Sequence, residues 1–201
     1  MKTLLHLGCA SLNIYDLKGF IPNQWKEIRF DIDKNRNPDI VGTISDLSLV
    51  KTESVDAVYS AYNLDHLYSH KVPIALREFF RVLKNDGIAI VSCPDIQTIC
   101  ESISNDKLLE TLYESPAGPI SPIDVLFGNR NALAKGNQFM AKKSCFTYSV
   151  LNNLFGQVGF KSRYGGRVQN GRELFLVAFK QHKSENEIKK IADPFFPSNK
   201  L

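Results

Sequence analysis

Paired cysteines and clusters of metal ligands are missing from this chain of 201 residues. None of its four cysteines forms a C-x-x-C pair, so the sequence signals neither a zinc site nor a disulfide framework. His6 and Cys9 make one H-x-x-C spacing, but no second ligand pair accompanies it, and we expect no metal. Reduced thiols of this kind are typical of a cytoplasmic protein.

Long apolar runs and a large excess of one charge are also missing. No stretch approaches the roughly 20 apolar residues that cross a bilayer, and no signal-peptide cleavage pattern follows the start of the chain. The net charge of +4 is scattered, which does not favour a membrane or nucleic acid as partner. These absences predict a cytoplasmic globular protein of about one domain.

Short apolar runs separated by helical or turn-like segments are what the chain does contain. They predict strands at residues 3–7, 27–32, 40–44, 55–59, 88–93 and 174–179. Several runs are continuous, which is typical of strands covered on both faces. Between the fourth and fifth runs we expect one helix, capped by Ser69, with Pro73 in its first turn and a turn at residues 85–87 after it. Strand, helix and strand at this spacing indicate a parallel α/β sheet.

The rest of the chain predicts two further helices, an insertion and a tail. Helical spacing covers residues 96–113 and 147–159, whereas residues 115–145 are rich in turn residues and predict an irregular lid or binding loop. We expect one domain over residues 1–183 and a tail over 184–201. Phe195 and Phe196 in the tail are expected to dock on the domain or on another subunit, which leaves a homodimer open.

One face of the sheet is expected to be thinly covered near its edge. Residues 33–38 leave room for a loop but not for the helix that normally connects parallel strands. Gly19 and Pro22 interrupt any helix over residues 12–26.

Polar residues follow the predicted strands in order, as expected of an α/β sheet that binds its ligand at the carboxyl ends of the strands. An acid about 20 residues beyond the first glycine is where a ribose is held, and Asp31 has this spacing from Gly8. Asp33 shares the strand face of Asp31, so both are candidates, with Asp31 preferred, and an ordinary strand-end turn remains the alternative. The full series is Gly8; Asp31 and Asp33; Asp46; Tyr62, Asn63 and His66; Pro94 and Asp95.

The first loop lacks the later glycines of a dinucleotide site. Such sites need G-x-G-x-x-G so that a diphosphate can approach the backbone, but here only Gly8 is present and Ala10 stands at the second glycine position. The loop therefore favours a ligand with adenine and ribose but no diphosphate.

At this point the residues resemble a small class I, Rossmann-like S-adenosylmethionine-dependent methyltransferase, over residues 3–95. The first motif, acidic-x-G-x-G-x-G, appears as His6-Leu7-Gly8-Cys9-Ala10-Ser11, without the leading acid and the later glycines. The downstream resemblance is stronger: Phe30-Asp31-Ile32, Ser45-Asp46-Leu47, residues 55–60, Leu64-Asp65-His66-Leu67, and residues 77–87, which are similar to the R-V-L-K-x-G-G helix exit. The family's sheet is mostly parallel, with an antiparallel C-terminal strand.

The resemblance implies S-adenosyl-L-methionine as cofactor and assigns roles to the series. Asp31 would hold the ribose, Ile32 and Leu47 would flank the adenine, and Asp46 would accept a hydrogen bond from its amino group. The methionine part would lie near Gly8, Cys9, Ala10, Tyr62 and Asn63. His66 is the candidate base, because an imidazole exchanges protons near neutral pH, or else it is a structural residue at a helix start.

The methyl acceptor is not identified by the sequence. Residues 60–63 do not match the D/N-P-P-Y/F motif of amino-methylating nucleic-acid enzymes, so a small or peripheral acceptor is favoured over nucleic acid. Six insertion residues could meet a polar or anionic acceptor or form a solvated loop: Asn129, Arg130, Asn137, Gln138, Lys142 and Lys143. A non-catalytic binding or assembly module remains an alternative, and so does a nicotinamide-dependent oxidoreductase, although no catalytic Tyr-x-x-x-Lys is recognisable.

Overall fold

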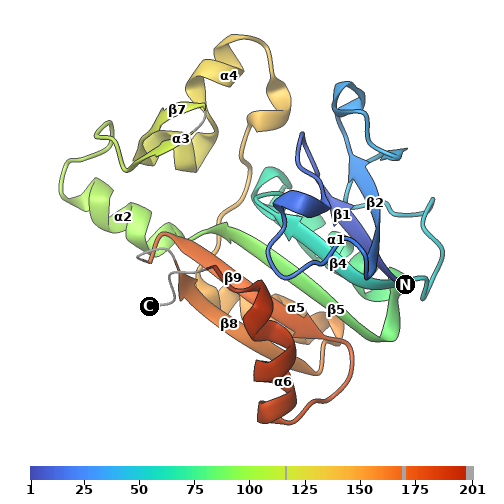
Figure 1. The fold of residues 1–201 in the computed structure, drawn as a ribbon. Helices are drawn as coiled ribbons and strands as arrows, with labels where there is room; N and C mark the ends of the chain where they lie inside the picture. Colours follow the sequence, from blue (N-terminus) through green and yellow to red (C-terminus); the bar gives the residue numbers. More distant parts are fainter. Residues whose placement is uncertain (116, 169–170, 198–201) are drawn as a thin grey trace.

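A seven-stranded sheet organises the protein (Figure 1). The computed structural model describes residues 1–115, 117–168 and 171–197, and the strand order is β3-β2-β1-β4-β5-β9-β8. β1 to β5 pair in parallel, and β9 runs antiparallel between β5 and β8. The predicted Rossmann-like, mostly parallel sheet with an antiparallel C-terminal strand is therefore confirmed. The strands are β1 (Lys2–Leu7), β2 (Trp25–Asp31), β3 (Ile40–Val41), β4 (Val55–Ala61), β5 (Leu83–Pro94), β8 (Ser162–Val168) and β9 (Glu173–Phe179).

Two helices, α1 (Val72–Val82) and α5 (Tyr148–Val158), cover one face of the sheet. α1 buries Leu76 and Phe79 against the sheet, as its spacing predicts. Its start differs from the prediction, because Ser69 opens a short 3-10 turn (Ser69–Lys71) and Lys71 occupies the N-cap position. Its end differs too: the predicted turn at residues 85–87 lies within β5, where the pairing with β4 shifts register.

The opposite face has no crossover helix after β1. Only a 3-10 turn (Ile14–Asp16) forms there, and the C-terminal helix α6 (Glu185–Ala192) covers the face instead. Phe195 and Phe196 follow α6 and are 8% and 5% exposed. Phe195 packs against Phe20, with ring centroids 4.9 Å apart, and Phe196 packs against Phe175. The two phenylalanines thus dock on the domain, completing a face that the chain's first connection leaves bare.

The link between β2 and β3 is as short as the sequence predicts. It contains a single 3-10 turn (Lys34–Arg36), yet the two strands pair in parallel. β3 has only two residues instead of the predicted five, and just beyond it the Gly42 amide donates to the Asp31 carbonyl, 2.9 Å away. Ile32 and Val41 are 50% and 51% exposed at this thinly covered edge.

The insertion after α2 (Ile96–Ser104) contains short regular elements where an irregular segment was predicted for residues 115–145. It contains a hairpin, two short helices and a 3-10 turn, and it stands beyond the carboxyl ends of β4 and β5 (Figure 1). Ser121 and Asp124 form a capping box at the first of these helices, and Val125 packs with Ile99 in a small separate core. The elements are β6 (Tyr113–Ser115), β7 (Gly118–Ile120), α3 (Pro122–Phe127), α4 (Arg130–Ala134) and a 3-10 turn (Gln138–Met140). No helix in the described part of the chain is long and apolar enough to cross a membrane.

Candidate functional site

The loop after β1 keeps the backbone shape of a glycine loop while using its own amides internally. Gly8 has φ +61° and Ala10 has φ +46°, in the left-handed region that glycine adopts freely. The amides of Gly8 and Cys9 both donate to the Phe30 carbonyl, at 2.8 and 3.3 Å, and the Ala10 amide donates to Asp31 Oδ2 at 2.8 Å. None of these three N–H groups is therefore free to receive a phosphate.

Asp31 lies at the end of β2, beside this loop, and is 7% exposed. Its Oδ1 accepts a hydrogen bond from the Asp33 amide at 2.8 Å, in addition to the bond from Ala10 at Oδ2. No ion pair holds it among the described residues. A carboxylate has about four acceptor positions, so Asp31 is oriented by the backbone and keeps acceptor capacity for hydroxyl groups.

Asp33, the other acidic candidate, has a local role. Its side chain accepts from the Asn35 amide at 3.0 Å and caps the 3-10 turn, and Arg36 Nε lies 3.4 Å from its Oδ2. Ile32 between the two acids offers an exposed apolar side chain. The geometry therefore favours Asp31 over Asp33 as the ligand-binding acid.

Arg29 is a residue of this site that the sequence reading missed. Its guanidinium donates to the carbonyls of Ala10 and Asn37, both at 2.8 Å, and to that of Leu12 at 3.2 Å. It thereby ties the β1 loop to the loop after β2, on either side of Asp31. The available signal was its position on the same strand face as Asp31 and Asp33.

His6 stands where the resembled motif has an acid, and a glutamate from the neighbouring strand supplies a carboxylate there. His6 is 2% exposed, and its Nδ1 lies 2.7 Å from Oε1 of Glu27. Burial lowers the pKa of His6, and the hydrogen bond with Glu27 acts in the opposite direction. Oε2 of Glu27 accepts from the Ile14 amide at 2.9 Å, so the pair holds the segment after the loop.

Tyr62 and Asn63, which were predicted site residues, follow the end of β4. The Asn63 side-chain amide donates to the Leu7 carbonyl at 2.9 Å and to Ser60 Oγ at 3.2 Å, which binds the end of β4 to the end of β1. Tyr62 has φ +55°, an uncommon conformation for a bulky residue. Non-glycine residues held in this region are often found at binding and active sites.

Asp46 and Leu47, the residues predicted to contact the adenine, differ in exposure. Leu47 is fully buried in the core and offers no side-chain surface to a ligand. Asp46 is exposed, and its carboxylate accepts from the Ser48 amide at 3.0 Å, which lowers its pKa. Because β3 ends at Val41, Thr43 carries the first side chain beyond the Gly42 contact with Asp31.

His66 lies in a turn fastened to the end of the insertion. Its Nδ1 lies 2.9 Å from the Ala141 carbonyl and must donate to that oxygen, so a neutral ring presents Nε2 as the acceptor. Lys142 Nζ is 2.7 Å from Oδ2 of buried Asp65, and the Lys143 amide donates to the Asp65 carbonyl. His66 is partly exposed, and its role as a base stays a prediction.

Several insertion residues predicted to meet an acceptor have structural partners. Asn129 caps α4, Arg130 Nε donates to Oδ1 of Asp124 at 2.9 Å, and Lys142 pairs with Asp65. Lys143 lies over the ring of Tyr68, 5.3 Å from its centroid. Most of the insertion side chains that were predicted to meet an acceptor thus already interact with other residues of the protein.

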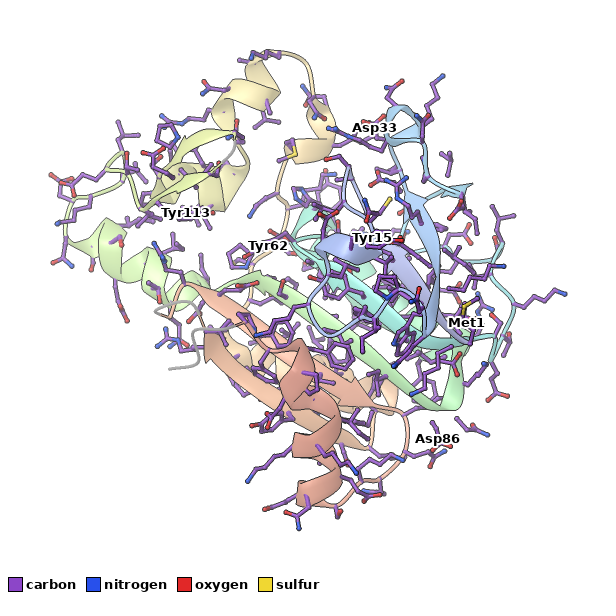
Figure 2. The ribbon with its side chains drawn as sticks, viewed as in Figure 1. Met1, Tyr15, Asp33, Tyr62, Asp86 and Tyr113 are labelled. Carbon is purple, nitrogen blue, oxygen red and sulfur yellow. The ribbon has the colours of Figure 1, made fainter. Side chains whose placement is uncertain are left out.

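A cavity of about 190 Å³ lies between the ends of β4 and β5 and the insertion. Tyr62 from the sheet and Tyr113 from the insertion both line it, and Figure 2 shows the two side chains in the gap between these parts of the chain. Glu173, at the start of β9, also lines it and is 5% exposed. The sequence reading missed Glu173 because it examined only residues that follow strands. β9 is antiparallel, so its first residue pairs with Pro94 at the carboxyl end of β5.

Comparison with known proteins gives one family match and many structural matches. Residues 23–91 match the methyltransferase domain family. Comparison with curated proteins finds no match.

Three solved structures illustrate the similarity of fold. A protein from Pyrococcus horikoshii is 12% identical with a TM-score of 0.61, covering 90% of this chain and 82% of its own. An S-adenosylmethionine-dependent methyltransferase from Thermotoga maritima, described as a possible histamine N-methyltransferase, is 15% identical with a TM-score of 0.56, covering 90% and 83%. A possible exported protein from Bordetella parapertussis is 14% identical with a TM-score of 0.57; 90% of this chain is covered, but only 62% of that protein's length. The family match and the shared fold confirm the resemblance seen in the motifs: this chain has the fold of a class I, Rossmann-like methyltransferase.

Proposed function

We propose that this protein transfers a methyl group from S-adenosyl-L-methionine to a small acceptor. The match to the methyltransferase domain family and the shared fold support methyl transfer in general and this cofactor in particular. The single observation in this chain that carries the assignment is the hydrogen bonding of the Asp31 carboxylate. Its carboxylate is oriented by the Ala10 and Asp33 amides and keeps capacity to accept hydrogen bonds.

The residues around Asp31 fit an adenosine-containing cofactor that has no phosphate. Asp31 would accept hydrogen bonds from the two ribose hydroxyls, and exposed Ile32 would contact the adenine. We assign the second side of the adenine to the segment at Gly42 and Thr43 in place of Asp46 and Leu47. Bound S-adenosyl-L-methionine supplies an already activated methyl group, so the protein's task is to align the acceptor and exclude water.

The same loop disfavours the nicotinamide-dependent alternative. A dinucleotide needs free backbone N–H groups for its diphosphate, whereas the amides of Gly8, Cys9 and Ala10 are already bonded to Phe30 and Asp31. A non-catalytic module would bind the cofactor or a partner without forming a methylated product. Incubation of the protein with a cell extract and methyl-labelled cofactor distinguishes the two alternatives, because only an enzyme forms a labelled product.

Calorimetry with S-adenosylhomocysteine, the demethylated product, tests the proposal. We expect micromolar binding that Asp31→Asn weakens by at least about tenfold, as the loss of charged hydrogen bonds implies. Asp33→Asn is the matched control, because asparagine can still cap the 3-10 turn, and it should bind within about threefold of wild type. Absence of heat with wild type, or equal effects of the two substitutions, would reject the assignment.

A further inference from the structure

Glu173 is a buried carboxyl group with one unpaired oxygen, and it lies at the wall of the cavity beside Tyr62. Burial raises the pKa of this carboxyl group, and the neighbouring side chains of Ser92 and Tyr62 act to lower it. Among the described residues, no partner reaches its Oε2. Buried polar atoms are nearly always paired, so an unpaired acceptor at a cavity wall indicates that a ligand donates to it.

The other walls favour a ligand with positive charge. The rings of Tyr62 and Tyr113 line the cavity, and aromatic faces attract cations. Glu114 adds a second carboxylate. The guanidinium of Arg172, the cation in the lining, donates to the Leu112 carbonyl at 2.9 Å and lies over the Tyr113 ring. The lining therefore contains the carboxyl groups of Glu173 and Glu114 and one cation, Arg172, which already has partners within the protein.

The burial of Glu173 also favours a positively charged ligand. Removing Glu173 from water raises its pKa, which means that its charge is poorly stabilised in the ligand-free protein. An ammonium group placed at Oε2 would supply the missing hydrogen bond and the missing opposite charge together. A neutral hydroxyl group would supply only the hydrogen bond, and an anion would be repelled.

We propose that this cavity binds the amino group of a small amine through Glu173, with the rings of Tyr62 and Tyr113 flanking it. The cavity volume of about 190 Å³ suits a molecule of modest size rather than a polymer. Identification of this amine as the methyl acceptor rests on the proposed function, whereas binding of the amine does not.

A pair of probes of nearly equal shape tests the inference. Benzylamine is protonated at pH 7.5, and benzyl alcohol is its neutral counterpart. The full chain is titrated with each probe, and binding is followed by NMR chemical shifts. We expect benzylamine to bind at least about tenfold more tightly than benzyl alcohol, and Glu173→Gln to abolish that preference. Equal binding of the two probes, or binding of neither, overturns the inference.

Glu101→Gln is the control substitution, because Glu101 is an exposed carboxylate on α2 that does not line the cavity, so its charge is screened by water. It should change benzylamine binding by less than about threefold. If Glu173→Gln fails to fold, the comparison of benzylamine with benzyl alcohol on the wild-type protein still tests the inference. Binding of S-adenosylhomocysteine is measured separately: if it binds and benzylamine does not, the inference fails while the proposed function stands.

Discussion

The side chain of Asn63 occupies the space that a β-carbon on Gly8 would need. A β-carbon built there would lie 1.9 Å from Asn63 Oδ1, so the two positions are sterically coupled. The glycine that begins the resembled motif is thus required by a contact inside the protein. The Asn63 amide in turn fastens the end of β4 to the end of β1 through the Leu7 carbonyl.

This contact predicts non-additive substitutions. Gly8→Ala should destabilise the protein by more than about 2 kcal/mol, because it combines a clash with a left-handed φ of +61°. Asn63→Ala should cost about 1–2 kcal/mol through its lost hydrogen bonds. Urea unfolding of both single variants and the double variant measures the coupling. The double variant should be more stable than the sum of the two costs by at least about 1 kcal/mol, and strict additivity would contradict the steric account.

The helix-exit motif of the sequence has a structural explanation in Arg81. Its Nη2 donates to the Leu47 carbonyl at 2.7 Å and its Nη1 to the Val50 carbonyl at 3.0 Å, while Glu78 Oε2 accepts from the Leu47 amide at 2.8 Å. We expect Arg81→Gln to lower the free energy of unfolding by about 1–3 kcal/mol. Arg77→Gln, on the exposed side of the same helix, should change it by less than about 0.5 kcal/mol.

The ion pair between Arg81 and Glu78 makes the stability of the protein depend on pH in a defined direction. The hydrogen bond from Arg81 lowers the pKa of Glu78 below its usual value of 4.5, so the unfolded chain binds the proton more readily than the folded one. The stabilisation is present above pH 4.5 and is lost as the pH falls through the lower folded pKa. The difference in stability between wild type and Glu78→Gln should therefore shrink between about pH 5 and pH 3. A difference that is constant over this range would contradict the assignment.

Sequence patterns predicted the sheet and the position of Asp31 at the end of a strand because both depend on local signals. Apolar runs specify buried parallel strands, and a carboxylate at the end of β2 follows from strand alternation alone. The burial of Leu47 was not predicted, because it depends on packing in the core and not on the local pattern after β3. Glu173 was missed because it precedes its strand: the expected antiparallel direction of the C-terminal strand places its first residue, not its last, at the carboxyl end of β5.

Ala10 allows a test of the altered glycine loop. A left-handed φ costs a non-glycine residue about 1–2 kcal/mol, whereas glycine adds a backbone-entropy cost of roughly 0.5–1 kcal/mol. Ala10→Gly should therefore leave stability unchanged or raise it by up to about 1 kcal/mol. Ala75→Gly in the buried face of α1 is the comparison and should cost about 1 kcal/mol or more. Chemical denaturation measures both, and a loss of stability in Ala10→Gly comparable to that of Ala75→Gly would contradict the strain at φ +46°.

The C-terminal phenylalanines compensate for the missing crossover helix, and this predicts that the chain's end is essential to its stability. Phe195 is 8% exposed and packs on Phe20, and a β-carbon on Gly19 would lie 2.4 Å from its ring. Phe195→Ala should lower the free energy of unfolding by about 3–5 kcal/mol, the usual cost of removing a buried aromatic ring. Phe127→Ala, at a position 62% exposed in the insertion, should change it by less than about 0.5 kcal/mol. Hydrogen exchange would add a local readout, because loss of the Phe195 ring should speed exchange of the amides around Leu17 and Phe20 before those of β4. If Phe195→Ala unfolds like wild type and leaves exchange near Phe20 unchanged, this segment does not cover the sheet, and another part of the chain must cover that face.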